Sequence, residues 1–213
     1  MRGWVIFGLL FVQVQPVLAD QLARNPKESQ ALVHLDRREF KSARKLAEES
    51  LKTENTLIAT YVLGIVHSEG EGNLARGLFL IRNAKELLFI GYGRPPKSEH
   101  SKRWHKRILM SEQAVLGMMD RRDEQLAILD EYDTHYVPKQ TARRIWPLLK
   151  LARYDEARTI GKSLIHHDHP AIRERAYNGL MAIEEEAGSR RASYDWGRLG
   201  LNDTGGESCI IAT

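Results

Sequence analysis

Apolar residues recur at helical spacing through most of the chain. Around the polar turn at residues 36–39 they are three or four positions apart: Ala31, Leu32, Leu35, Phe40, Ala43, Leu46, Ala47 and Leu51. This spacing places an apolar stripe along one face of a helix. The strict alternation of apolar and polar residues that marks a strand is not convincing anywhere in the sequence. The pattern therefore predicts an all-α chain of helices joined by short turns.

A repeated unit underlies this pattern. Each copy has a turn, then an aromatic residue or leucine, then a small residue three positions later, and then an apolar helix. The clearest copies have the small residues Ala43, Gly77 and Ala157, and weaker copies align at Leu126 and Ser193. Taken in order, these five positions are 34, 49, 31 and 36 residues apart. The long step contains a stretch rich in glycine and proline, residues 91–98, which we expect to form a loop.

The chain resembles the tetratricopeptide repeat family over residues 27–205, because that family has a period of 34 residues. In the family each repeat is two antiparallel helices that approach closely where a large residue meets a small one. Leu63-Gly64, Leu116-Gly117 and Gly179-Leu180 match the contact positions of the first helices, and Ala84 matches a later small position of a second helix. The resemblance implies a superhelical solenoid of about five antiparallel helical hairpins.

The sequence divides into five parts. Residues 1–19 resemble a secretory signal peptide, with a charged start, a short apolar run and a small residue at the expected cut. An uncleaved membrane anchor or a buried helix is the alternative. The other parts are repeats 1 and 2 at residues 20–90, the loop at 91–98, repeats 3 to 5 at 99–205 and the start of a truncated helix at 206–213. The signal predicts an exported protein of the bacterial envelope, periplasmic or secreted.

Composition narrows the class of protein. The 213 residues carry a net charge of +4, with 28 acidic residues interleaved among 32 basic ones. This mild basicity is not that of a nucleic-acid-binding tail. The single cysteine, Cys209, rules out an intrachain disulfide framework and a cysteine-rich zinc module.

Several clusters of reactive side chains occur without the spacing of a catalytic or metal site. The run from His166 to His169 falls between two predicted helices, where a solvated loop is favoured because zinc needs three or four convergent ligands. The acidic run at residues 184–186 is expected to lie on a solvated helix face. The sequence has no nucleophile elbow, phosphate loop or dinucleotide fingerprint. It thus predicts a protein that is not an enzyme and uses no cofactor or metal.

Two further features concern the predicted first helices of repeats 3 and 4. The densest basic stretch, residues 97–107, surrounds Trp104 and is interpreted as the solvated side of a long helix, with Trp104 packed under the loop. Pro147 follows Trp146 inside a predicted helix, and proline removes a backbone donor there. We expect either a kink near Ile145 or a helix that begins late.

By resemblance to tetratricopeptide proteins, the chain is expected to bind a peptide or protein in a groove formed by the first helices. The candidate residues occupy outward positions of those helices: His34, Arg38, His67, Arg103, Lys106, Arg143, Arg144, Arg173 and Asn178. Their basic bias predicts an acidic partner and no nucleic acid, with membrane contact only through an uncleaved signal. Two alternatives stay open: a docking arm of an envelope enzyme whose catalytic domain follows residue 213, and a structural protein that self-associates through residues 206–213.

Overall fold

The computed structural model of the chain describes residues 26–204, so the predicted signal peptide and the predicted helix at 206–213 lie outside the described residues. The all-α prediction is confirmed for the described part, which contains helices and no strand. Its ten α-helices are α1 (Pro26–Asp36), α2 (Phe40–Leu51), α3 (Leu57–Ile65), α4 (Leu74–Tyr92), α5 (Glu99–Met118), α6 (Arg122–His135), α7 (Ile145–Lys150), α8 (Tyr154–Leu164), α9 (Pro170–Glu186) and α10 (Arg190–Thr204). A π-helical segment, η1 (Val66–Gly70), extends α3, and a 3₁₀ segment, η2 (Thr141–Arg144), precedes α7.

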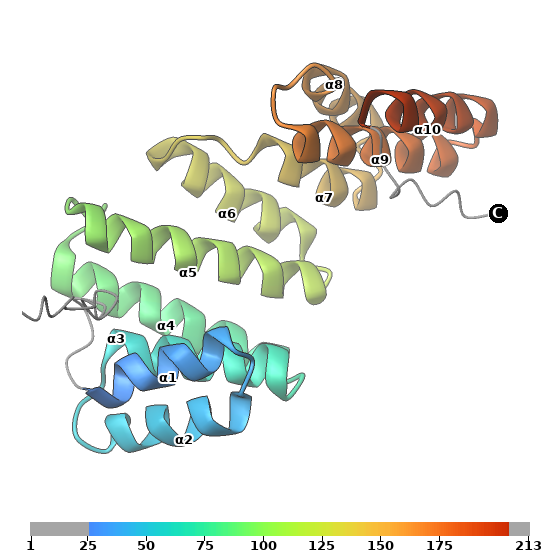
Figure 1. The fold of residues 1–213 in the computed structure, drawn as a ribbon. Helices are drawn as coiled ribbons and strands as arrows, with labels where there is room; N and C mark the ends of the chain where they lie inside the picture. Colours follow the sequence, from blue (N-terminus) through green and yellow to red (C-terminus); the bar gives the residue numbers. More distant parts are fainter. Residues whose placement is uncertain (1–25, 205–213) are drawn as a thin grey trace, which may run out of the picture.

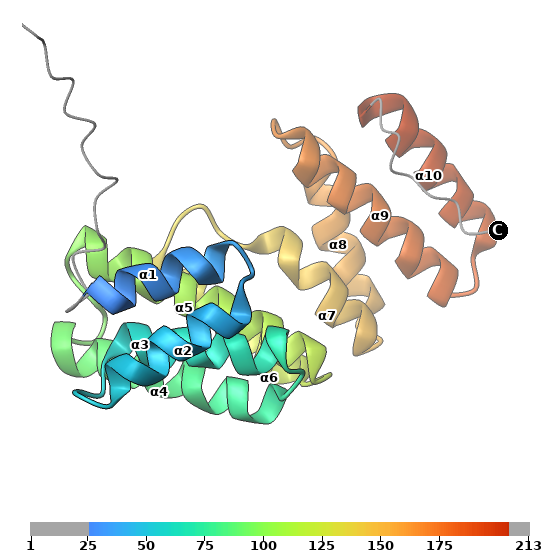
Figure 2. The ribbon, with the colours of Figure 1, turned by 60° about the horizontal axis from the view of Figure 1, so that its bottom comes forward.

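The helices pack in consecutive pairs, and each helix also contacts the next one along the chain. Figure 1 shows the pair α1 and α2 at the bottom, then α3 and α4, then α5 and α6, with α7 to α10 continuing beyond α6. The view in Figure 2 shows the same succession from another side, with α10 at the far end. The first helices of the pairs are α1, α3, α5, α7 and α9, and the second helices are α2, α4, α6, α8 and α10.

The turn inside every pair has the same backbone geometry. Two residues before each second helix, one residue has a positive φ of 56° to 80°: Arg38, Gly72, Asp120, Ala152 and Gly188. In four turns the amide of the next residue donates to a carbonyl five residues back, as Glu39 does to His34 and Ser189 does to Glu184. This is the Schellman arrangement, which satisfies carbonyls at a helix end. In the second pair Asn73 donates to His67, six residues back, because the π-helical segment adds one residue to the last turn.

Close approach of paired helices depends on glycine. An added Cβ at Gly77 of α4 would lie 2.6 Å from the Ser68 Cβ and 2.8 Å from the Gly64 carbonyl oxygen. At Gly64 of α3 it would lie 2.8 Å from the Ile81 side chain. The equivalent small residues Ala43 and Ala157 are fully buried. These residues let the helix backbones meet, as the sequence pattern predicts.

Two apolar clusters form the core and meet at α6. The first cluster runs from α1 to α6 and includes Ile128 and Tyr132, while the second runs from α6 to α9 and includes Leu126 and Leu129. Ion pairs also hold α6 on both sides. Arg82 of α4 binds Glu124, and Arg144 of η2 binds Asp130 at 2.7 Å and Asp133 at 2.9 Å. Helix α6 therefore joins the two halves of the molecule.

Two local predictions need correction, the bounds of the glycine- and proline-rich loop and the exposure of the acidic run at 184–186. Helix α4 continues to Tyr92, so the loop is residues 93–98 rather than 91–98; Gly93, with φ of 82°, ends the helix where Gly91 does not. At Pro147 one of the two expected outcomes is found. The helix begins late, because α7 starts at Ile145 and a proline in the first turn lacks only an amide that has no helical partner.

The acidic run at 184–186 is not wholly solvated. Glu184 is buried and accepts a hydrogen bond from the Arg158 Nε at 2.7 Å, whereas its two successors are exposed. Adjacent residues on a helix point about 100° apart, so one member of the run faces α8.

Candidate functional site

A cavity of about 370 Å³ lies where four elements of the second half meet α5. Its lining comes from α5, α6, η2, α7 and α9: Gln113, Gln125, Ala142, Arg143, Ile145, Trp146, Pro147, Arg175, Asn178 and Gly179. We call it the arginine cavity. Four of the five contributing elements are first helices or the turn that leads into one, and α6 is the exception. This is the side of the molecule on which the sequence predicts a groove.

The charge of the arginine cavity is entirely positive within the part of the chain that the structure describes, because no carboxylate lines it there. Burial lowers the pKa of Arg143, and the neighbouring guanidinium of Arg175 lowers it further. The Nε of Arg143 donates to the Gln140 side-chain oxygen at 2.9 Å, which supplies no compensating charge. Two like charges are therefore held close together, and an anion placed between them would relieve their repulsion.

The wall of the arginine cavity combines an apolar surface with amide groups. Trp146 is half exposed, and the Lys150 ammonium lies 5.0 Å from the centre of its ring. At Gly179 an added Cβ would lie 2.6 Å from Ile145, so the glycine lets α9 pack directly against α7. The side-chain amides of Gln113, Gln125 and Asn178 can donate or accept hydrogen bonds. Such a wall suits a peptide, which has both apolar groups and backbone amides.

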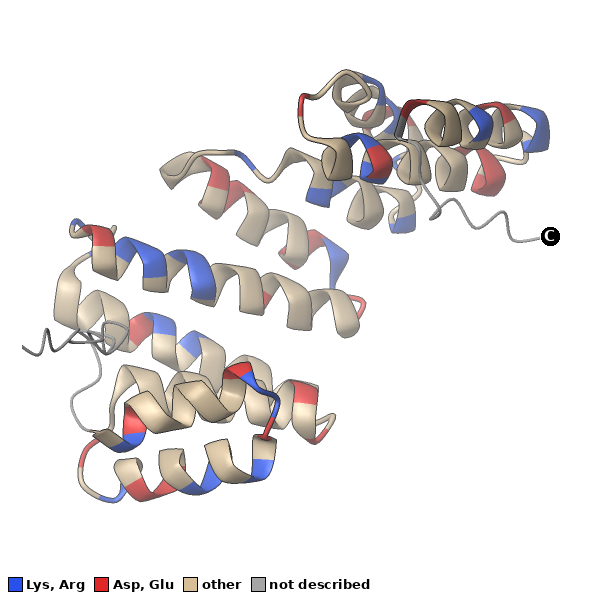
Figure 3. Cartoon of the chain, in the orientation of Figure 1, with Lys and Arg blue, Asp and Glu red and all other residues tan. Residues whose placement is uncertain are grey.

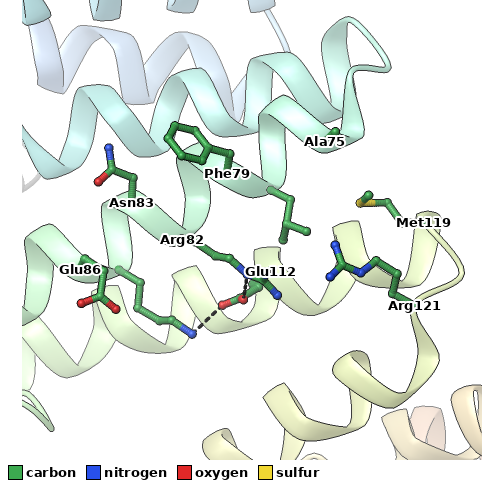
Figure 4. A pocket seen from close by; sticks show the side chains of 10 residues that line it. Ala75, Phe79, Arg82, Asn83, Glu86, Glu112, Met119 and Arg121 are labelled. Carbon is green, nitrogen blue, oxygen red and sulfur yellow. Dashed lines mark hydrogen bonds and ion pairs between the residues drawn. The ribbon is translucent and has the colours of Figure 1, made fainter.

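A larger cavity, of about 690 Å³, lies between α4 and the junction of α5 with α6. We call it the Glu112 cavity. Figure 4 shows Arg82 directed toward Glu112, with Phe79 on one side and Met119 and Arg121 on the other. Glu112 and Gln113 are neighbours on α5, yet they line different cavities. Helix α5 thus separates the two.

The cations of the Glu112 cavity already have anionic partners. The Glu112 carboxylate, almost fully buried, accepts hydrogen bonds of 2.7 Å from both Arg82 and Lys85. Arg121 pairs with Glu124, and Lys85 also contacts Glu131. Because its charges compensate one another, this cavity has no preference for an anionic ligand. The arginine cavity is the better candidate for binding.

A buried histidine extends this ion network toward α6. The Nδ1 of His105 lies 2.6 Å from the Tyr136 hydroxyl, and its Nε2 lies 3.3 Å from Glu131. Burial and the Glu131 charge raise the pKa of Tyr136 to about 12, so this hydroxyl stays protonated. The hydrogen bond to His105 and the charge of Lys85 hold the pKa of Glu131 at about 2, although partial burial opposes this shift.

The network predicts acid sensitivity. The pKa of Glu131 in the folded chain is about 2, below the ordinary 4.5, so its stabilising contribution is complete above pH 4.5 and is lost as pH falls toward 2. We expect this loss to be on the order of 2 kcal/mol. Urea unfolding at several pH values would measure it, compared with Glu131→Gln, which should be less stable at pH 7 but flatter between pH 5 and 2. Parallel pH profiles for the two proteins would contradict the assignment.

Of the nine residues predicted from the sequence, the structure brings two together in the arginine cavity, Arg143 and Asn178. Arg143 lies in the 3₁₀ segment rather than on a first helix. Arg144 lies beside it but turns away, since it is held by Asp130 and Asp133 on α6. Arg173 binds Asp203 of α10 at 2.8 Å and the His167 carbonyl oxygen at 2.9 Å.

The other predicted residues lie away from this cavity. His34 contacts Glu39 across the first turn, and Arg38 is in that turn, not on the helix, where it pairs with Glu69. His67 lies in the π-helical segment and pairs with Glu71. Arg103 is exposed on α5, and the ammonium of Lys106 lies 4.8 Å from the centre of the Tyr136 ring.

Sequence reasoning missed Arg175, Gln113, Gln125 and Trp146, although all four line the arginine cavity. Of these four residues, only Arg175 could have been found from the sequence. It is a basic residue two positions after the predicted Arg173 on the same helix. Arg175 lines the cavity and Arg173 does not, because residues two apart on a helix face nearly opposite sides.

The histidine run between α8 and α9 has a structural role. The imidazole of His169 accepts a hydrogen bond from the Ala171 amide and caps α9, and His167 accepts one from the His169 amide. Among the described residues, no three histidine, cysteine, aspartate or glutamate side chains gather to hold a metal ion. Trp104 packs edge-on against Tyr61 of α3, at 5.4 Å between ring centres.

Comparisons with protein-family models, with curated proteins and with solved structures found no significant match to this chain.

Proposed function

We propose that the chain is a non-catalytic scaffold of the bacterial envelope that binds a segment of another protein. In this proposal the five helix pairs form a solenoid like that of tetratricopeptide proteins, with the first helices along the binding side. The repeated positive-φ turn supports it, since Arg38 and Gly72 are one 34-residue period apart. The glycine and alanine residues at the helix contacts support it as well.

The arginine cavity is the anchoring point for the partner in this proposal, and its chemistry favours an acidic segment. The observation that carries this is the pair Arg143 and Arg175, held together with no lining carboxylate among the described residues. A guanidinium presents two parallel donors to a carboxylate, which gives both strength and orientation. Trp146 supplies the large apolar contact typical of an energetic anchor in a binding surface.

Charge reversal at this pair tests the proposal. We expect Arg143→Glu with Arg175→Glu to weaken binding of a fluorescent glutamate-rich peptide at least tenfold at low salt, which is about 1.4 kcal/mol. Fluorescence anisotropy would measure the affinity. Arg144 is unsuitable for this test, because its reversal would also break the contacts with α6.

The matched control is Arg190→Glu with Arg191→Glu at the exposed start of α10, which changes the net charge equally. Its affinity should stay within about twofold of the unchanged chain, since exposed charges far from the site are screened. Equal losses in the two double variants would show that the peptide responds only to overall charge.

A further inference from the structure

One end of the molecule, where α4 ends, α5 begins and α6 ends, exposes apolar side chains. Ile90 on the last turn of α4 is 81% exposed, Val137 after α6 is 76% exposed and Tyr92 is 42% exposed. None of the three lines either cavity described above. They project from the ends of helices and do not form a pocket.

Packing contacts connect these helix ends to one another. The Arg94 guanidinium lies 4.3 Å from the Phe89 ring centre, and Phe89 packs edge-on against His105 at 5.0 Å. His105 in turn packs against Tyr136, which precedes Val137, at 5.6 Å between ring centres. The α4 end and the α6 end therefore lie on opposite sides of the start of α5.

The same end is rich in basic side chains, and two of them lie over rings next to the exposed apolar residues: Arg94 over Phe89, and Lys106 over Tyr136. The basic side chains come from the loop, the first turns of α5 and the segment after α6: Arg94, Lys97, Lys102, Arg103, Lys106 and Lys139. Of the carboxylates at this end, Glu86 pairs with Arg94, Glu99 pairs with Lys102, and Glu131 contacts His105. In Figure 3 the blue of lysine and arginine follows the first half of α5 at this end.

We propose that this end docks on an anionic membrane surface. Exposed apolar side chains beside cations fit a lipid interface, where the apolar groups enter the headgroup layer and the cations meet anionic headgroups. No helix among residues 26–204 is both long and apolar enough to cross a membrane. Tyr92 suits that position, since its ring is apolar and its hydroxyl polar.

The course of the chain agrees with this orientation. Helix α1 begins at the same end as the loop between α4 and α5, as both ribbon views show. The sequence before α1 contains the apolar run at residues 4–12. This docking is independent of the arginine cavity.

A fluorophore placed on the docking surface tests the proposal in the full chain. Cys209→Ser removes the native thiol, and Ile90→Cys then accepts an environment-sensitive dye. With vesicles containing phosphatidylglycerol we expect a blue shift and at least a threefold rise in emission, and no change with pure phosphatidylcholine. The same dye at Leu199→Cys, an exposed position on α10, should not respond. This local readout separates docking from any effect of residues 4–12.

Charge reversal identifies the residues responsible. Lys97→Glu with Arg103→Glu should raise the vesicle concentration for half-maximal response at least fivefold, whereas Lys41→Glu with Lys45→Glu on α2 should leave it unchanged. The proposal is overturned by a dye at position 90 that stays in water with anionic vesicles. An equal effect of the α2 control, or a response to soluble polyglutamate but not to vesicles, would also overturn it.

Discussion

Gly77→Ala is expected to lower the free energy of unfolding by about 2–3 kcal/mol. The added methyl group would lie 2.6 Å from the Ser68 Cβ, 2.8 Å from the Gly64 carbonyl oxygen and 2.9 Å from the Ser68 amide nitrogen. Two of these three atoms belong to the backbone, so a change of side-chain rotamer does not relieve the clash. Helices α3 and α4 must move apart at their crossing.

Gly91→Ala is the matched control for this prediction, because it lies in the last turns of the same helix. An added Cβ there has no atom within 4 Å outside its own surroundings in α4. The substitution should be neutral or raise stability by up to about 1 kcal/mol, since alanine favours the helix over glycine. Urea unfolding of both variants would measure the effects. If the two substitutions changed the free energy of unfolding in the same direction, the α3–α4 contact would not depend on Gly77.

Glu112→Ala is expected to cost about 3 kcal/mol of stability. Its carboxylate is almost fully buried and binds Arg82 and Lys85, each at 2.7 Å. Removal leaves the Lys85 ammonium, itself only 12% exposed, with the more distant Glu131 at 3.3 Å. This loss of stability lies at the low end of the range for breaking a buried ion pair. Both cations keep a second carboxylate, Glu124 for Arg82 and Glu131 for Lys85.

Glu86→Ala provides the comparison for Glu112. Both glutamates line the same cavity, but Glu86 is exposed and pairs with Arg94 alone. Its removal should change stability by less than about 1 kcal/mol, as is usual for surface ion pairs. Thermal unfolding of the two variants under the same conditions distinguishes them. Similar unfolding temperatures for the two variants would show that the ion pairs of Glu112 add little to the packing of α4 against α5.

The sequence predicted the helices and their pairing well, because both depend on local signals. Apolar spacing fixes which faces are buried, and threonine and proline favour helix starts, where the structure has Thr56 and Pro170. The π-helical segment after α3 was not predictable in this way. It spans five residues, too few for a periodic signal, and the Ser68 hydroxyl bonds to the carbonyls of Gly64 and Ile65 inside the packed crossing.

The candidate site was only partly predictable, because it is assembled from helices far apart in sequence. Arg143 and Arg144 look equivalent in the sequence, but only the structure places Asp130 and Asp133 beside Arg144. Conversely, Gln113 is a polar residue on a long helix, and nothing local indicates that α9 faces it across a cavity. Packing between helix pairs decides which charges are already paired and which are available to a ligand.

Photo-crosslinking from the arginine cavity tests the central proposal most directly. Trp146 is replaced by a photoreactive phenylalanine analogue in the full chain, and the crosslinked peptide from envelope fractions is sequenced. We expect the crosslinked segment to be rich in aspartate and glutamate. The crosslink should be lost when Arg143 and Arg175 are both changed to glutamate, and it should be absent when the analogue stands at Leu199. Capture of neutral or basic segments, or of the same segment despite the charge reversal, would contradict it.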